Sequence, residues 1–309
     1  MRSFVTSVTR ALLLIGPACV LSCGNAERDS APKETTLYAR LGKEAGIERL
    51  ASDFLSRVLA DPKINGYFLN SSLDRSRFVS CLVKQLGNAA GGPQKYPDPE
   101  AGCRDMRTAH QGLGISRHDF DDMVLHLTAT LSDAKHQAQD IETLTQRIVP
   151  LAEDVVEDPN NDQSVYQRMG RKPAISALVD AFVARVAADA RINGFFTNAA
   201  RIPRLKTCLV RQVCSIDGPC QYGKEVGATV GEIEPGVSLE SPCRSMKEIH
   251  ARMRDSAGSP VTIEDFNALV EDLGVELEAA NVPEAERAAL LEALGPLCAD
   301  IVGAPEECG

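Results

Sequence analysis

Concentrated positive charge is missing from this sequence of 309 residues. No lysine- and arginine-rich block occurs, and the formal net charge is −10. Proteins that bind phosphate backbones carry basic patches, so a nucleic-acid partner is not expected. No segment alternates apolar and polar residues as a half-buried strand does. Cys-x-x-Cys spacings are also absent, which argues against a thiolate metal centre and against redox work through a reversible disulfide.

Long apolar runs are equally scarce, and the one that occurs lies at the N-terminus. Arg2 and Arg10 precede "ALLLIGPACVLSCG", which is too short for a membrane-spanning helix and has the form of an export signal. Its ending, "VLSC", resembles the lipobox of bacterial lipoproteins. We therefore expect a signal peptide over residues 1–23, lipidation of Cys23 and a tether over residues 24–35. The alternative is an ordinary cleaved signal peptide.

Export would set the compartment of the mature protein. A lipidated Cys23 would hold it on a lipid bilayer of the bacterial cell envelope, facing the periplasm or on the outer membrane. Besides Cys19 and Cys23 the chain has eight cysteines, an even number, in an oxidising compartment where disulfides persist. These eight cysteines are therefore candidates for disulfide bonds.

The rest of the chain contains an internal repeat of two copies. "LYARLGKEAGIERLASDFLSRVLADPKINGYF" matches "VYQRMGRKPAISALVDAFVARVAADARINGFF" without a gap, and "SCLVKQL" later matches "TCLVRQV". We expect two domains, a first unit at residues 36–158 and a second unit at residues 163–303. The second unit is longer at 223–241 and at 254–261. The turn residues in these two stretches indicate surface loops rather than new elements.

Helical periodicity dominates both units. In the first unit, Ile47, Leu50, Phe54 and Val58 recur three or four residues apart and make one apolar stripe. "ISRHDFDDMVLHLTATL" and "TIEDFNALVEDLGVEL" each place a Ser or Thr capping candidate before an amphipathic helix. Each unit is therefore expected to be a small all-α domain of about four main helices.

Two similar octets, "CRDMRTAH" and "CRSMKEIH", end in His110 and His250. The chain has five histidines, and the second unit has only His250. A lone histidine on a helix is more often structural than a ligand. Its return at the end of a duplicated octet favours a functional role.

Further motifs identify a family. "LYARLG", "GIERLASDF", "RVLADPKINGYF", "GGPQKY" and "MRTAHQGLGISRHDF" together resemble the group I truncated haemoglobins. The second unit resembles them more loosely, through "VYQRMG", "DGPCQYG" and "MKEIH", with Asp217 at the first glycine of the Gly-Gly-Pro turn. The resemblance implies two tandem truncated-globin domains, each a two-over-two helical sandwich. It assigns the proximal haem ligands to His110 and His250, so one or two haems are the expected cofactors.

The resemblance also implies the residues that would contact haem. They are Phe54, Leu55, Phe68, Phe78 and Leu82 in the first unit, and Phe182, Val183, Phe196, Leu205 and Leu209 in the second. A Tyr that commonly donates a hydrogen bond to bound dioxygen in the family is replaced by Leu55 and Val183. Gln85 and Gln212 are expected at the pocket edge. Loss of the donor disfavours tight dioxygen storage and NO dioxygenation, so no catalytic residue is predicted, whereas CO and NO need no donor.

The repeat also pairs cysteines. Cys81 corresponds to Cys208 and Cys103 to Cys243, which favours one bridge within each unit. The resulting candidate pairs are Cys81–Cys103 and Cys208–Cys243, with Cys214–Cys220 and Cys298–Cys308 as further candidates. The sequence alone does not fix the connectivity.

Two functions remain open from the sequence. The first is a haem-binding truncated haemoglobin that reversibly binds a diatomic gas (O2, NO or CO) at the cell envelope, with a redox partner that the sequence does not identify. The alternative is a globin fold retained as an envelope interaction module, with haem lost from the second unit or from both. Asp217 and the enlarged loops favour the alternative for the second unit.

Overall fold

The computed structural model describes residues 35–69, 74–157, 164–198, 201–223, 230–238 and 240–308. The predicted signal peptide, the lipidation site Cys23 and nearly all of the predicted tether lie outside the described residues. Within them the regular structure is helical, apart from one isolated bridge between Asp98 and Cys103. None of the helices in the described ranges is long and apolar enough to cross a membrane.

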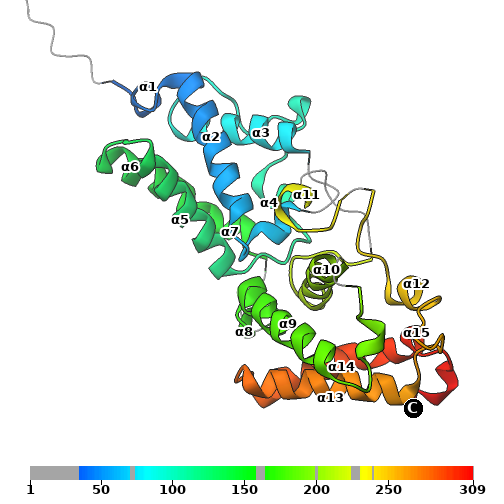
Figure 1. Cartoon of the computed structure of the whole chain (residues 1–309). Helices are drawn as coiled ribbons and strands as arrows, with labels where there is room; N and C mark the ends of the chain where they lie inside the picture. The colour runs from blue at the N-terminus through cyan, green and yellow to red at the C-terminus, as the bar shows by residue number, and fades with distance from the viewer. Residues whose placement is uncertain are drawn as a thin grey trace, which may run out of the picture. The chain divides into compact units, whose positions relative to one another are not determined.

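The first unit is built around one long helix (Figure 1). Helix α2 packs against both α3 and α5, and the short α4 packs against α7. The elements in order are α1 (Leu37–Arg40), α2 (Lys43–Ala60), η1 (Asn65–Phe68), α3 (Arg75–Ala89), η2 (Pro99–Ala101), α4 (Met106–His110), α5 (Arg117–Asp133), α6 (Ala138–Ile148), η3 (Val149–Leu151) and α7 (Ala152–Val155).

The second unit follows with helices in the same order. α9 has 18 residues like α2, α12 has five like α4, and α13 has 17 like α5. The elements are α8 (Val165–Arg168), α9 (Arg171–Ala188), η5 (Asn193–Phe195), α10 (Ile202–Cys214), α11 (Val230–Ile233), α12 (Met246–His250), α13 (Ile263–Ala279), α14 (Glu284–Leu294), η7 (Gly295–Leu297), α15 (Cys298–Ile301) and η8 (Pro305–Glu307).

The expected helix starts are present in both units. Ser116 begins α5 with a capping box, because its side chain accepts a hydrogen bond from the N–H of Asp119 and Asp119 returns one to Ser116. Thr262 and Asp265 make the same arrangement at α13. These caps satisfy N–H groups that the first turn of a helix leaves without partners. They confirm the capping prediction made from the sequence.

The turn after the α3 and α10 helices is built alike in the two units. A Cβ on Gly92 would lie 2.6 Å from the ring of Tyr38, and one on Gly218 would lie 2.6 Å from the ring of Tyr166. Only glycine permits this close approach. Asp217 keeps the turn in the second unit, because its carboxylate accepts two backbone N–H bonds at the start of α8, at 2.7 and 2.9 Å.

The described cysteines form four disulfides, and each is a pair expected from the sequence. They are Cys81–Cys103, Cys208–Cys243, Cys214–Cys220 and Cys298–Cys308. The first ties α3 to the segment before α4, and the second ties α10 to the segment before α12. The helix that faces each histidine-bearing segment is thus covalently held to it.

The prediction that residues 223–241 form only a surface loop is wrong. This stretch contains α11 and buries two of its side chains, Glu234 at 6% exposure and Val237 at 2%. Glu234 is drawn inward because its carboxylate pairs with Lys172 at 2.6 Å and with Arg211 at 2.5 Å. The two units also belong to one compact body, Thr36–Gly309.

Candidate functional site

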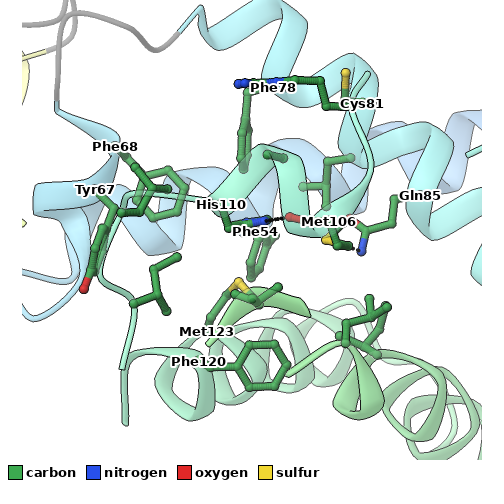
Figure 2. A pocket seen from close by; sticks show the side chains of 18 of the residues that line it. Phe54, Tyr67, Phe68, Phe78, Cys81, Gln85, Met106, His110, Phe120 and Met123 are labelled. Carbon is green, nitrogen blue, oxygen red and sulfur yellow. Dashed lines mark hydrogen bonds between the residues drawn. The ribbon is translucent and has the colours of Figure 1, made fainter. Parts of the chain in front are cut away.

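A cavity of about 360 Å³ lies in the first unit, between α3, α4 and α5. Figure 2 shows His110 among the lining side chains, with Tyr67 and Phe68 on one side and Gln85 and Met106 on the other. The lining is mostly apolar. Five of the residues predicted to contact haem or its iron are among those that line it, namely Phe54, Phe68, Phe78, Leu82 and His110.

His110 is the last residue of α4, and its ring is held in one orientation. Its Nδ1 lies 2.7 Å from the carbonyl oxygen of Met106, one helical turn earlier. A carbonyl can only accept, so Nδ1 carries a proton, and in the neutral ring Nε2 therefore keeps its lone pair. Burial lowers the pKa of His110 below its ordinary value, which favours the neutral ring. A neutral imidazole with a free Nε2 is the form in which histidine binds a metal.

Glu157, near the C-terminal end of the first unit, holds the loop that follows His110. The carboxylate of Glu157 accepts hydrogen bonds from the backbone N–H groups of Gly112 and Gly114, the latter at 2.7 Å. These bonds hold the pKa of Glu157 below its ordinary value. Both glycines have positive φ, 81° and 63°, which allows the chain to present its N–H groups to one carboxylate.

Helix α3 forms the wall opposite His110. Phe78 and Leu82 line the cavity, and the ring of Phe78 packs edge-on against Phe68 with centroids 5.5 Å apart. Gln85, which the sequence placed at the pocket edge, is also among the lining residues. Its Nε2 donates to the Met106 sulfur at 3.7 Å. The α3 wall is therefore apolar except for the Gln85 amide, which contacts Met106 of α4, and the Arg77 guanidinium.

The position of Leu55 differs from the expectation that this residue lines the pocket. It is 1% exposed and is not among the described residues that line the cavity. Phe54 and Leu55 are successive residues of α2, so they point about 100° apart around the helix. Phe54 faces the first unit's core and cavity, whereas Leu55 packs with residues of both units. This shared cluster contains Leu55, Leu59, Leu69, Cys208, Val237 and Cys243.

Sequence reasoning missed a polar pair in the wall. Tyr67 of η1 and Asp119 of α5 both line the cavity, and the Tyr67 hydroxyl donates to the Asp119 carboxylate at 2.8 Å. Burial, with the negative charge of Asp119, raises the pKa of Tyr67 above its ordinary value. The only signal in the sequence was that the second unit has Phe195 where the first has Tyr67.

The cavity also has positive groups among its lining residues. Arg77 and Arg104 are exposed residues that line it. Tyr96 lies beside them and donates its hydroxyl to the Arg104 carbonyl at 2.9 Å. Burial raises the pKa of Tyr96 to about 12, so it stays a donor. Two guanidinium groups near an apolar cavity would attract carboxylate groups of a bound molecule.

The second unit repeats the histidine arrangement. His250 ends α12, and its Nδ1 lies 2.9 Å from the carbonyl oxygen of Met246. Burial lowers the pKa of His250 as well. Gln212 is buried. The five other predicted residues of this unit belong to its hydrophobic core cluster: Phe182, Val183, Phe196, Leu205 and Leu209.

Comparison with known proteins places the first unit in a family. Residues 36–157 match the family described as bacterial-like globin. The group 1 truncated hemoglobin GlbN of Mycolicibacterium paratuberculosis is 29% identical over 120 residues, which are 39% of this chain and 83% of that protein. GlbN of Synechocystis is 31% identical over 103 residues, which are 32% of this chain and 77% of that protein.

Solved structures of truncated haemoglobins also match part of the chain. The truncated hemoglobin of Tetrahymena pyriformis in its Fe(III) form is 24% identical, with a TM-score of 0.36, covering 40% of this chain and all of that chain. The 2/2 hemoglobin of Synechococcus in the cyanomet state, with covalently attached heme, is 26% identical over the same shares, with a TM-score of 0.36. On the strength of the sequence relatives, the chain belongs to the group 1 truncated haemoglobin family through its first unit.

Proposed function

We propose that the first unit binds haem in the cavity and that Nε2 of His110 is the iron ligand. The observation that carries this proposal is the imidazole of His110, held in one orientation on the wall of an apolar cavity. The residues fit the group: Phe54, Phe68 and Leu82 offer apolar surface to a porphyrin. Arg77 and Arg104 offer positive charge to its two carboxylates. Bound haem would supply an iron centre at which a small gas can bind.

The gas is a diatomic molecule, and the wall opposite His110 discriminates among O2, NO and CO. Phe78 and Leu82 offer no hydrogen bond, the Tyr67 hydroxyl is already donated to Asp119, and the Gln85 amide donates to the Met106 sulfur. A hydrogen bond to a partly charged ligand contributes about 1.5–3 kcal/mol. Without that contribution dioxygen is held weakly, whereas CO and NO lose little. Reversible binding of CO or NO is therefore favoured over oxygen storage.

The second unit is proposed to be a second truncated globin with His250 as its iron ligand. Support comes from the matching order of helices, from the His250–Met246 hydrogen bond and from the turn at Gly218. In this proposal the chain is a tandem duplication that carries two haems. The haem-free alternative for this unit remains the competing outcome of the experiment below.

We further propose export and anchoring at the cell envelope. The sequence basis is the lipobox-like "VLSC", with Cys23 as the lipidated residue and a lipid bilayer as partner. Support comes from the four disulfides, because such bonds persist in oxidising compartments and rarely in the cytosol. The partner that reduces the iron is a separate protein or small molecule of that compartment.

Haem stoichiometry tests the proposal directly. Absorption spectra would be recorded on purified mature protein, on His110→Ala, on His250→Ala and on a control, His118→Ala, whose side chain is exposed on α5. The proposal expects two haems, each lost with its own histidine, and no loss in the control. One haem, lost only with His110, would leave the second unit as an interaction module. No haem in the mature protein would overturn the haemoglobin function.

A further inference from the structure

The cavity wall of the first unit that carries Tyr67 and Phe68 is contacted along its length by the second unit. The carbonyl of Lys63 accepts the Tyr166 hydroxyl at 3.2 Å. The buried Asn65 accepts a hydrogen bond from the Lys172 ammonium at 3.0 Å. A Cβ on the next residue, Gly66, would lie 2.9 Å from the ring of Pro219. This segment, residues 63–69, therefore has the cavity on one side and the second unit on the other.

Asp119 connects the cavity to the second unit. Its side chain is 2% exposed, and its Oδ2 accepts from the Tyr67 hydroxyl at 2.8 Å. The same carboxylate accepts from two side chains of the second unit, Gln167 at 3.0 Å and Arg171 at 3.2 Å. Arg171 also pairs with Asp122 at 2.7 Å. One buried carboxylate thus joins a cavity-lining tyrosine to a guanidinium of the second unit.

The residues that make this link differ between the two copies. Three of the linking groups occur only in the unit where they reach the other unit, because the counterpart residue lacks the group. The pairs are Tyr67 and Phe195, Gln167 and Ala39, and Arg171 and Lys43. In the second unit the segment equivalent to residues 63–69 has another neighbour, because a Cβ on Gly194 would lie 3.5 Å from Ser256 of an enlarged loop.

The Cys214–Cys220 bridge belongs to the same contact. It has no counterpart in the first unit, where Gln94 stands in place of Cys220 by the Gly-Pro register. It closes the turn that contains Pro219, and the Cys220 sulfur would lie 3.4 Å from a Cβ on Gly66. Because the disulfide already restricts this short loop, the loop loses little conformational entropy when it packs against the first unit.

We propose that the second unit positions residues 63–69 of the first cavity, and that Arg171 is the main positioning residue, acting through Asp119 on Tyr67. This proposal depends on the proposed function in one respect only, namely that the group bound in the cavity is haem. Tyr67 and Phe68 stay against the cavity because Asp119, Asn65 and Gly66 are all held from the second unit. Removal of these contacts frees the wall without touching the iron ligand.

Hydrogen exchange on the full mature chain, freed of haem, tests the positioning step by itself. Arg171→Asn is the main variant, because Arg171 has φ +60° and asparagine tolerates that conformation. Arg171→Lys is the rescue variant, since Lys43 occupies the same position in the first unit with φ 56°. Arg168→Gln is the matched control, because Arg168 pairs with Glu286 inside the second unit.

The expected result is faster exchange in peptides covering residues 61–69. Loss of one or two hydrogen bonds predicts an increase of roughly three- to tenfold in Arg171→Asn, with partial recovery in Arg171→Lys and no local change in Arg168→Gln. An unchanged rate in Arg171→Asn would overturn the proposal. So would an increase spread evenly over the chain, because that is general destabilisation.

A second readout uses the haem-loaded chain in a His250→Ala background, where only the first cavity would hold haem. Haem transfer to excess apomyoglobin and CO rebinding after flash photolysis would be compared between Arg171→Asn, Gln167→Ala and the Arg168→Gln control. Haem loss is expected to quicken by roughly three- to tenfold in the first two. Equal rates in all three would overturn the proposal. If no variant takes up haem, the proposed function fails, and the exchange experiment still decides the positioning.

Discussion

The Cys81–Cys103 bridge gives the sharpest prediction about how the first cavity is held together. It joins α3, which carries Phe78 and Leu82, to the segment that leads into α4 and His110. Its sequence separation is 22. In the chain-entropy account, a closed loop of that length contributes about 3.4 kcal/mol to the free energy of unfolding at 25 °C. The double variant Cys81→Ala, Cys103→Ala should lose most of this contribution.

The expected shift in melting temperature follows from the size of the unit. Residues 36–157 match the globin family, and unfolding a unit of that length carries an entropy of about 0.26 kcal/mol per kelvin. A loss of about 3.4 kcal/mol then lowers the melting temperature by about 13 °C. Circular dichroism would follow the helices, and the haem absorption band would follow the cavity.

The Cys298–Cys308 bridge supplies the control. It lies in the second unit and has a sequence separation of 10, for which the same account gives about 2.7 kcal/mol. The Cys298→Ala, Cys308→Ala variant should therefore destabilise the protein, while the first cavity keeps its haem at temperatures where the second unit is still folded. A shift below about 3 °C in the first variant would refute the reasoning. Equal early loss of haem from the first cavity in both variants would refute it too.

Three further predictions concern single residues. Because burial lowers the pKa of His110, the folded state binds fewer protons than the unfolded one, so its stability contribution is present above about pH 6.5 and is lost as pH falls. Acid unfolding curves of the haem-free chain should therefore show a smaller loss of stability below pH 6.5 in His110→Gln. Gly92→Ala should lower the free energy of unfolding by about 1–3 kcal/mol in a denaturant titration, because the new Cβ would lie 2.6 Å from the Tyr38 ring. Gly274→Ala, within α13, has open space around it and should raise the free energy of unfolding by about 0.5–1 kcal/mol. Glu234→Gln leaves Lys172 and Arg211 buried without their anionic partner and should cost about 3–5 kcal/mol in the same assay. A loss under about 1 kcal/mol would show that water reaches the two cations.

Local rules account for what the sequence predicted well. The capping boxes at Ser116 and Thr262 and the long amphipathic helices depend on residues within a few positions of each other. The orientation of His110 is local too, since its Nδ1 partner is the carbonyl four residues earlier in the same helix. The Cys81–Cys103 and Cys208–Cys243 bridges could be anticipated because the repeat aligned their cysteines in pairs.

Contacts between the units account for what the sequence did not predict. Leu55 was placed in the pocket because the family resemblance has a pocket tyrosine at that position, but its direction is set by a cluster that includes residues of the second unit. Tyr67 forms a polar pair in the cavity wall because its hydroxyl donates to Asp119. This partner lies 52 positions away in the sequence, so no local pattern predicts the pair. Glu234 was taken for a loop residue, and its burial depends on two cations that no spacing rule connects to it. Contacts between residues that are far apart in the sequence follow no helical or strand periodicity, so a single sequence does not predict them.

The position of Leu55 links the chemistry of the cavity to the contact between the units. The family commonly has a tyrosine at this position, where it donates to bound dioxygen. Here the side chain is 1% exposed in an apolar cluster with residues of the second unit. A tyrosine hydroxyl at that place would be buried among apolar groups, with a desolvation penalty unless it found a partner. An apolar residue at position 55 is therefore what the contact with the second unit requires. The same replacement removes the donor that the family commonly has, so under the proposed function the packing of the two units and weak binding of dioxygen would have one structural cause.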